Sequence, residues 1–287
     1  MLALRRRDGV AARHLAVPAL QVEARLLRGR AADELRPAAE MTHPSVWEGF
    51  GAEAAAYERG RPGYPDDAAA WLVATLGLGP GRCVVDLAAG TGKLTRLLVR
   101  SGARVVAVEP ADGMRAELVR AVPGVEAVAG RAEELPFPDG SVDAVTVAQA
   151  FHWFATDEAL AEIARVLRPA GKLALVWNVR DLDDPLQRAL WELVEPLRPE
   201  EHRHATRSWR EVLEGNPRFG PPEEATFAHS QRVDGDTLVD RVGSISFVAT
   251  LPEPQRGELL ARVRALASGG EAVVDYRTEL YAAELVP

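Results

Sequence analysis

The stretch Cys83-Val-Val-Asp-Leu-Ala-Ala-Gly-Thr-Gly92 decides the fold of this chain of 287 residues. Its first five residues form a short apolar run, which predicts a buried β-strand over Cys83–Leu87. The two glycines at its end allow a tight turn, and the leucines that follow from Leu94 predict a helix directly after the turn. A buried strand, a glycine-rich turn and a helix in this order are typical of nucleotide-binding α/β proteins.

The alternation of helices and strands continues on both sides of this stretch. A helix is expected from Pro65 onwards, before the first strand. After the stretch, apolar runs predict strands at Arg104–Val108, Val125–Ala129, Val142–Ala148 and Lys172–Trp177, with helices at Met114–Ala121 and Thr156–Leu167. Apolar strands separated by helices predict an α/β fold with a doubly wound, mostly parallel sheet, which binds its ligands at the carboxyl ends of the strands.

The alternation becomes less regular after Asn178. Helical periodicity occurs near Leu186–Leu197, Thr237–Ser244 and Pro254–Ala267, and alternating apolar residues at Ala225–Val233 and Ala272–Leu280 favour antiparallel strands that close one edge of the sheet. No linker-like tract separates this part from the rest. We therefore expect one domain over residues 41–287, with a cofactor-binding core at about 64–178 and a substrate-binding or lid part at about 181–287.

Residues 1–40 form an Arg- and Ala-rich N-terminal extension, which we expect to be poorly ordered or helical and dispensable for activity. The extension holds eight Arg and five acidic residues, net +3, so the remainder of the chain carries −8 − 3 = −11. An acidic domain disfavours a nucleic-acid partner, because phosphate contact needs a basic face. No apolar run reaches about 18 residues and the single cysteine is Cys83, so we expect a cytoplasmic protein without a membrane partner.

Three nucleotide-binding motifs compete for the glycine loop, and their spacing separates them. A phosphate-binding Walker loop needs glycine at the position of Leu87 and a hydroxyl residue at the position of Leu94, so this interpretation fails twice. A dinucleotide-binding fingerprint that begins at Gly90 needs glycine or alanine where Thr95 stands. That mismatch weakens the dinucleotide interpretation without excluding it.

The acid that ends the first strand favours a third kind of ligand. The carboxylate of Asp86, if directed into the loop, suits a cationic cofactor with an amino group and would repel a pyrophosphate. S-adenosylmethionine is such a cofactor. Gly90 and Gly92 let the backbone approach the ligand, and Glu109, 17 residues after Gly92, can accept hydrogen bonds from both ribose hydroxyls.

Four segments taken together resemble successive motifs of the class I S-adenosylmethionine-dependent methyltransferases. They are Asp86-Leu-Ala-Ala-Gly-Thr-Gly92, Val106-Ala-Val-Glu-Pro110, Leu135-Pro-Phe-Pro-Asp-Gly-Ser-Val-Asp143 and Arg165-Val-Leu-Arg-Pro-Ala-Gly171. The resemblance implies a Rossmann-like fold with an antiparallel edge strand, S-adenosyl-L-methionine as cofactor and methyl transfer as the activity. It also implies cofactor contacts from Tyr57, Arg61, Asp86, Ala88, Gly90, Gly92, Glu109, Pro110, Met114, Ala132, Glu133 and Gln149.

Two further segments resemble a subgroup that acts on small molecules, including the trans-aconitate methyltransferase type. They are Tyr57-Glu-Arg-Gly-Arg-Pro-Gly-Tyr-Pro65 and Gln149-Ala-Phe-His-Trp153. The likeness places Tyr57 and Arg61 at the carboxylate end of the cofactor, and in Gly130-Arg-Ala-Glu-Glu134 it places Ala132 and Glu133 beside the adenine. The expected partner is therefore a small-molecule methyl acceptor.

Two residues depart from the family pattern. Glycine is usual where Ala88 stands, and a pair of glycines is usual where Ala170-Gly171 stands. Alanine at position 88 leaves the turn possible but adds a methyl group near the amino-acid end of the cofactor. These departures keep a second function open, a protein that binds the cofactor without catalysis, and the dinucleotide-dependent oxidoreductase remains as a third.

His152 and Tyr57 are the candidate catalytic residues. A histidine titrates near neutral pH and can act as a general base, but His152 lies between Phe151 and Trp153, where a structural or lid role competes with catalysis. An acceptor that is itself a carboxylate would need no base. Asn178 and Tyr57 are both candidates to contact the acceptor.

Aromatic residues and a histidine pair complete the candidates in the C-terminal part. Aromatic side chains available for a lid are Trp191, Trp209, Phe219 and Phe247. His202 and His204 have the spacing of a metal pair, but no third ligand lies near them in the sequence. We therefore expect a solvated loop at these histidines and no metal site.

Overall fold

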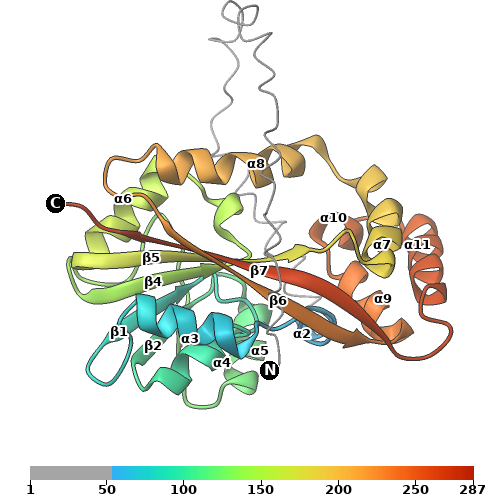
Figure 1. The fold of residues 1–287 in the computed structure, drawn as a ribbon, viewed down its shortest axis with the longest axis horizontal. Coiled ribbons are helices and arrows are strands. Elements are labelled where there is room, and N and C mark those ends of the chain that lie inside the picture. Colours follow the sequence, from blue (N-terminus) through green and yellow to red (C-terminus); the bar gives the residue numbers. More distant parts are fainter. Residues whose placement is uncertain (1–53) are drawn as a thin grey trace, which may run out of the picture. The chain divides into compact units, whose positions relative to one another are not determined.

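A seven-stranded sheet in the order β3-β2-β1-β4-β5-β7-β6 forms the centre of the fold (Figure 1). The strands are β1 (Cys83–Leu87), β2 (Arg104–Val108), β3 (Glu126–Val128), β4 (Val142–Ala148), β5 (Leu167–Arg180), β6 (Glu223–Val233) and β7 (Ala272–Glu284). The first five strands pair in parallel, which confirms the predicted mostly parallel sheet. The computed structural model describes residues 54–287, with the backbone alone for residues 201–207, so the predicted extension at residues 1–40 lies outside the described residues.

The antiparallel strand is β7, and it lies one place inside the edge of the sheet. β7 runs antiparallel to both of its neighbours, β5 and β6. Its residues from Leu280 to Ala283 are buried in succession, as expected for a strand covered on both faces. β6 alternates exposed and partly buried residues and forms the edge. The sequence alone placed both segments at the edge but could not order them, because their pairing is a long-range contact.

The helices follow the predicted alternation. Those that pack along the sheet are α3 (Asp66–Thr75), α4 (Thr95–Leu98), α5 (Asp112–Ala121), α6 (Asp157–Val166) and α8 (Glu200–Glu214), and the others are α2 (Ala54–Gly60), α7 (Pro185–Val194), α9 (Gly235–Gly243), α10 (Ser246–Ala249) and α11 (Glu253–Ala265). In the described part of the chain, short 3₁₀ turns lie at Val99–Ser101, Phe151–Trp153 and Glu195–Leu197. Helix α6 begins where predicted because the Thr156 side chain accepts a hydrogen bond from Ala159 N.

Each face of the sheet buries its own hydrophobic cluster. Helices α3 and α4 cover one face, and α6 and α8 cover the other (Figure 1). Phe151, Leu160 and Ile163 are completely buried between the sheet and α6. Burial of each such side chain stabilises the fold by roughly 1.5–3 kcal/mol before entropy is considered, so these clusters hold the strand ends in place.

A third cluster builds what we call the cap, formed by α7, α9, α10 and α11 on the far ends of β6 and β7 (Figure 1). Its centre contains Leu238, Val242, Val263 and Tyr276. The C-terminal part is therefore divided, since β6 and β7 complete the sheet, while α7 before β6 and the three helices between β6 and β7 form the cap. The assignment of a substrate-binding or lid role to residues of about 181–287 stays a prediction.

Helix α8 was not predicted, and the expectation of a loop at His202 and His204 is wrong. Both residues lie within the helix Glu200–Glu214. The segment is dominated by polar residues, and the side chains that pack it onto the sheet cluster are few, among them Trp209 and Leu213. Its apolar face is narrow and most of its residues are polar, which is why the helix was not recognised in the sequence.

Candidate active site

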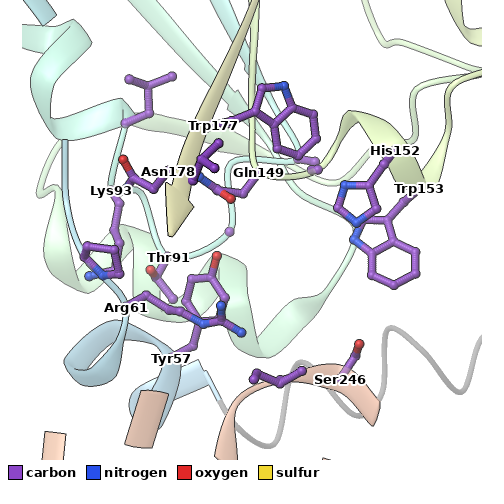
Figure 2. Close-up of a pocket in the computed structure, with 18 of the residues that line it drawn as sticks. Tyr57, Arg61, Thr91, Lys93, Gln149, His152, Trp153, Trp177, Asn178 and Ser246 are labelled. Atoms are coloured by element: carbon purple, nitrogen blue, oxygen red, sulfur yellow. The ribbon is translucent and has the colours of Figure 1, made fainter. Parts of the chain in front are cut away.

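A cavity of about 490 Å³ lies between the carboxyl ends of β1 and β4 and the cap. The loop after β1 and the loop after β4 form two of its sides, and β5 continues past them as a third side. Figure 2 shows Thr91 and Lys93 across the cavity from His152 and Trp153 in this view. The position is that expected for a ligand of a parallel α/β sheet, because the loops at the carboxyl ends converge there.

The structure brings most of the predicted site residues together at this cavity. Those that line it are Tyr57, Arg61, Ala88, Gly90, Glu109, Met114, Gln149 and His152. Pro110, Ala132 and Glu133 line a second, smaller cavity of about 20 Å³. Ala88 and Trp153 border both cavities, so the two are neighbours across these side chains. Asp86 and Gly92 line neither cavity.

Asp86 lies beneath the glycine loop and is completely buried. Its Oδ2 accepts a hydrogen bond of 2.6 Å from Thr95 Oγ1, and its Oδ1 accepts one of 3.0 Å from Thr146 Oγ1. Burial nevertheless raises the pKa of the Asp86 carboxyl from 3.8 to about 6, because two hydroxyl donors compensate only part of the lost hydration. This carboxyl therefore holds the loop from below and titrates closer to neutral pH than an exposed aspartate.

Glu109, at the end of β2, connects two backbone segments that border the cavity. Its Oε2 accepts a hydrogen bond of 2.9 Å from Gly90 N, and its Oε1 accepts one of 2.9 Å from Ala111 N. Burial raises the pKa of Glu109, and these two amide donors lower it in part. Each carboxylate oxygen keeps a further lone pair, so the group can accept hydrogen bonds from a ligand in the cavity.

The glycine loop combines three left-handed residues with different roles. Gly90 has a φ of 58°, and a Cβ at this position would meet no atom within 4 Å, so its surface is open toward a ligand. Gly92 has a φ of 84°, and a Cβ there would approach Leu118 Cγ at 3.0 Å, so this glycine serves the packing of the loop on α5. Ala88 has a φ of 54°, a conformation that favours glycine.

A positive φ at Ala88 and at Ala170 explains why the family usually has glycine at these two positions. Ala170 has a φ of 60°, like Ala88, and a left-handed residue with a Cβ costs roughly 1–2 kcal/mol. Gln149 also has a φ of 60° at the end of β4, and it lines the cavity. Strained backbone of this kind is common at functional sites, where the surrounding structure holds it in place.

Helix α2 brings Tyr57 and Arg61 to the cavity and ties the glycine loop to the cap. Glu58, on this helix, accepts hydrogen bonds of 2.6 Å from Thr91 Oγ1 and of 2.6 Å from Arg96 Nη2. The Arg61 guanidinium lies 5.2 Å from the centre of the Tyr57 ring and donates to Ser244. Burial raises the pKa of Tyr57, so its phenol is protonated at neutral pH and acts as a donor.

His152 belongs to an aromatic wall of the cavity. Its ring centre lies 4.6 Å from Trp153 and 5.3 Å from Trp177. Trp177 in turn lies 5.3 Å from Trp209, which comes from α8. Figure 2 shows His152 and Trp153 side by side at the edge of the cavity. The wall presents flat apolar surfaces to a ligand, which suits a planar acceptor.

Several cavity residues were missed by the sequence analysis, above all Trp177, Arg180 and Arg241. Arg241 carried a detectable signal, since it interrupts the apolar face of α9 between Leu238 and Val242, and it is 6% exposed. The sequence around Arg180 carried no such signal. Of the four aromatic lid candidates, Phe219 is wrong, because it is buried in the sheet cluster, whereas Trp191, Trp209 and Phe247 line the cavity.

The Asn178 side chain is held by the chain on both sides of its amide. Its Nδ2 donates to Gly63 O at 2.8 Å, and its Oδ1 accepts from Thr278 Oγ1 at 2.7 Å. The residue lines the cavity but positions the Pro62-Gly63 segment against β7.

Among the side chains that the structure describes, those of residues 54–200 and 208–287, no group of three or more His, Cys, Asp or Glu is arranged to hold a metal ion. In the same part of the chain, no helix combines the length and apolar composition needed to cross a membrane.

Comparisons with known proteins give the family. Residues 85–175 match the model of a methyltransferase domain. An uncharacterized methyltransferase of Mycobacterium tuberculosis is 40% identical over 236 residues, 79% of this chain and 88% of the relative. An uncharacterized methyltransferase-like protein of Schizosaccharomyces pombe is 34% identical over 219 residues, 76% of this chain and 85% of the relative.

A solved structure agrees with these relatives. A candidate type II methyltransferase from Anaeromyxobacter dehalogenans superimposes with a TM-score of 0.59 at 26% identity, over 79% of this chain and 99% of that one. The glycine loop after β1 and Glu109 after β2 belong to the segments on which the sequence resemblance rested. The chain belongs to the class I S-adenosylmethionine-dependent methyltransferases and is a methyltransferase.

Proposed function

We propose that the chain binds S-adenosylmethionine across the loop after β1 and transfers its methyl group to a small-molecule acceptor in the 490 Å³ cavity. The observation that carries the proposal is the Glu109 carboxylate, which is fixed by Gly90 N and Ala111 N beside the cavity. In this position it can accept hydrogen bonds from the ribose hydroxyls. The same cavity must hold the acceptor as well, which favours a small molecule over a macromolecule.

The residues at the cavity suit the donor chemically. Gly90 leaves open space where a Cβ would project, so the loop can approach a ligand closely. The buried carboxyls of Asp86 and Glu109 make this end of the site negative, which favours the ammonium and sulfonium charges, and Arg61 can bind the carboxylate of the donor. The small cavity beside Ala132 and Glu133 is the proposed position of the adenine, and its side chains would have to move apart to admit the base.

The chain's own contribution to the reaction is alignment. When bound, S-adenosylmethionine supplies a methyl group whose carbon–sulfur bond breaks, with its electron pair leaving to sulfur, as a lone pair of the acceptor forms the new bond. The glycine loop and Glu109 orient the donor, the aromatic wall at Trp177 orients the acceptor, and the cap excludes water. Holding both reactants in line supplies much of the rate enhancement of such a displacement. His152 remains a candidate base for acceptors that must lose a proton.

Calorimetry with S-adenosylmethionine and with NAD, followed by a turnover assay for S-adenosylhomocysteine, tests the proposal. We expect Glu109→Gln to weaken donor binding about 10- to 100-fold, because hydrogen bonds to a charged group are lost. Glu126→Gln is the matched control, since Glu126 lies on the neighbouring strand and pairs with Arg104 at the surface. Binding of NAD in preference to the methyl donor would refute the proposal, and donor binding without turnover of any acceptor would indicate a binding protein.

A further inference from the structure

The cavity extends well beyond the residues expected to hold the methyl donor. Gln149 N donates to Val176 O at 2.9 Å, which marks the level at which β4 ends. β5 continues for four more residues to Arg180, where it pairs with Tyr276 of β7. At a rise of about 3.3 Å per residue, Arg180 lies roughly 13 Å beyond that level along the strand. The far end of the cavity is therefore formed by β5 and the cap.

The cavity lining holds more cationic than acidic side chains, and Arg180 and Arg241 are the cations at its far end. The cationic side chains that line the cavity are Arg61, Lys93, Arg180, Arg198 and Arg241, whereas the acids that line it are Glu109 and Glu279. Lys93 pairs with Glu58, and Arg198 pairs with Glu195. Among the ion pairs between described residues, none includes Arg180 or Arg241. Glu279 accepts a hydrogen bond from Tyr281, and Glu109 lies at the donor end.

The two arginines are held in place by neutral groups. Arg241 Nη2 donates to Gln187 Oε1 at 3.1 Å, and its guanidinium lies 4.9 Å from the centre of the Tyr276 ring. The Arg180 guanidinium lies 4.5 Å from the centre of the Trp191 ring. Burial, together with the neighbouring charges of Arg241 and Arg61, lowers the pKa of Arg180 to about 9. The Asp184 carboxylate stabilises the charge of Arg241 without forming an ion pair with it. Buried cations without an ion pair are costly to the fold, so a ligand that supplies negative charge would relieve this cost.

The cavity also offers the flat surface that an unsaturated molecule requires. Trp177 and Trp209 lie 5.3 Å apart with their planes inclined by 31°, and both line the cavity. Trp177 Nε1 is buried and has no hydrogen-bond partner among the described residues. The site thus combines an aromatic wall, an indole donor and two unpaired guanidinium groups.

We propose that the methyl acceptor is a small planar organic anion, whose carboxylate or phosphate group is bound by Arg180 and Arg241 and whose unsaturated body packs on Trp177 and Trp209. This inference rests on the proposed function, because it assigns the second half of the same site. A guanidinium binds a carboxylate or a phosphate through two parallel hydrogen bonds, so it discriminates an acid from its neutral amide. An anion also offsets the positive charge that the sulfonium donor adds to this cavity.

The test uses matched acids and amides on the full chain saturated with S-adenosylhomocysteine. The probes are benzoate and cinnamate, with benzamide and cinnamamide as neutral counterparts and phenyl phosphate to compare the two anionic groups. We expect the acids to bind at least about tenfold more tightly than the amides. Arg180→Gln should abolish this preference while the affinity for S-adenosylhomocysteine changes less than about twofold, and Arg180→Lys should restore part of it.

Arg262→Gln is the control, because Arg262 is an exposed arginine on cap helix α11 and its loss changes the net charge equally. Equal binding of acids and amides by the wild-type chain would overturn the inference. Weaker S-adenosylhomocysteine binding by Arg180→Gln with an unchanged acid preference would overturn it too, since the guanidinium would then serve the donor. The inference would also be overturned if no probe bound at millimolar concentration while S-adenosylhomocysteine bound normally. If S-adenosylhomocysteine itself does not bind the wild-type chain, the proposed function fails first.

Discussion

The two ends of the cavity differ in how the chain satisfies its own charges. At the donor end, formed by Ala88–Leu94 and Glu109, the charged groups have partners in the chain: Glu109 accepts two backbone amides, and Lys93 donates to the Glu58 carbonyl at 2.7 Å. At the acceptor end, Arg180 and Arg241 rest on aromatic rings and an amide. The donor end is complete in itself, whereas the acceptor end leaves charge to be balanced by a ligand.

The comparison teaches that the two halves of the site come from different kinds of structure. The donor end is built from residues that directly follow β1 and β2, so two short local motifs order it. The acceptor end joins β5 to helices of the cap. Helix α2 links the two, because Glu58 binds the glycine loop while Arg59 pairs with Asp240 of α9 at 2.6 Å.

A substitution that separates α2 from α9 should lower activity more than the other substitutions in this section. A Cβ on Gly60 would lie 2.2 Å from Arg241 N and 2.5 Å from the Asp240 carbonyl carbon, so Gly60→Ala must push α2 and α9 apart. We expect kcat/KM for the acceptor to fall about 100-fold, since a misplacement of about 1 Å has this effect on alignment. The loss would occur even though alanine is the better helix former.

Gly63→Ala is the matched control for that substitution, because a Cβ at Gly63 would meet no atom within 4 Å. Its turnover and thermal stability should stay close to wild type. Full activity of Gly60→Ala would show that α2 does not set the position of the cap.

The donor end should respond to pH through Asp86. The pKa of its carboxyl is about 6 in the folded chain, above the ordinary value of 3.8, so the folded chain binds this proton more tightly than the unfolded chain. The contribution of Asp86 to stability is therefore most favourable below pH 4 and declines as the pH rises through 6. If the ionised form favours the ammonium of the donor, donor affinity should fall by up to about tenfold per pH unit below pH 6.

Calorimetric titration with S-adenosylmethionine between pH 5 and 8 measures this dependence, with Asp86→Asn as the variant that should flatten it. We expect that variant to gain stability at pH 7, because it buries no charge, and to lose donor affinity there. A profile that is the same in wild type and variant would assign the pH dependence to another group.

The smallest effect should come from the two left-handed alanines. Ala170→Gly relieves a φ of 60° at an exposed position, and Ala88→Gly relieves a φ of 54° at the border of both cavities. The gain from relieved strain exceeds the added entropy of the unfolded chain, so each should stabilise the fold by up to about 1 kcal/mol. In thermal unfolding this corresponds to an increase of about 2–4 °C in Tm.

The two alanine variants also test the donor end, because Ala88 borders both cavities and Ala170 borders neither. Ala170→Gly should leave donor affinity unchanged, whereas Ala88→Gly alters the surface that meets the donor and should change it. A lower Tm for Ala170→Gly would contradict the strain argument.

The fold was predictable where the pattern is local. Strands over Cys83–Leu87, Arg104–Val108 and Val142–Ala148 were predicted with their observed bounds, because a buried parallel strand is a continuous apolar run between turns. The extension of β5 to Arg180 was not, since its last residues pair with β7 about a hundred positions away. Helix α8 was missed because its apolar face is narrow and most of its residues are polar.

The sequence by itself therefore determined the parallel sheet, the glycine loop and the family, since all of these depend on residue types within short windows. Only the tertiary structure placed Asp86 beneath the loop instead of in the cavity, and only it brought Arg180, Arg241 and Trp209 to one site. Arg180 comes from the end of β5, Arg241 from cap helix α9 and Trp209 from α8, which covers one face of the sheet. Their meeting is a consequence of long-range packing, which carries no local pattern, and it is there that we expect the choice of acceptor to be made.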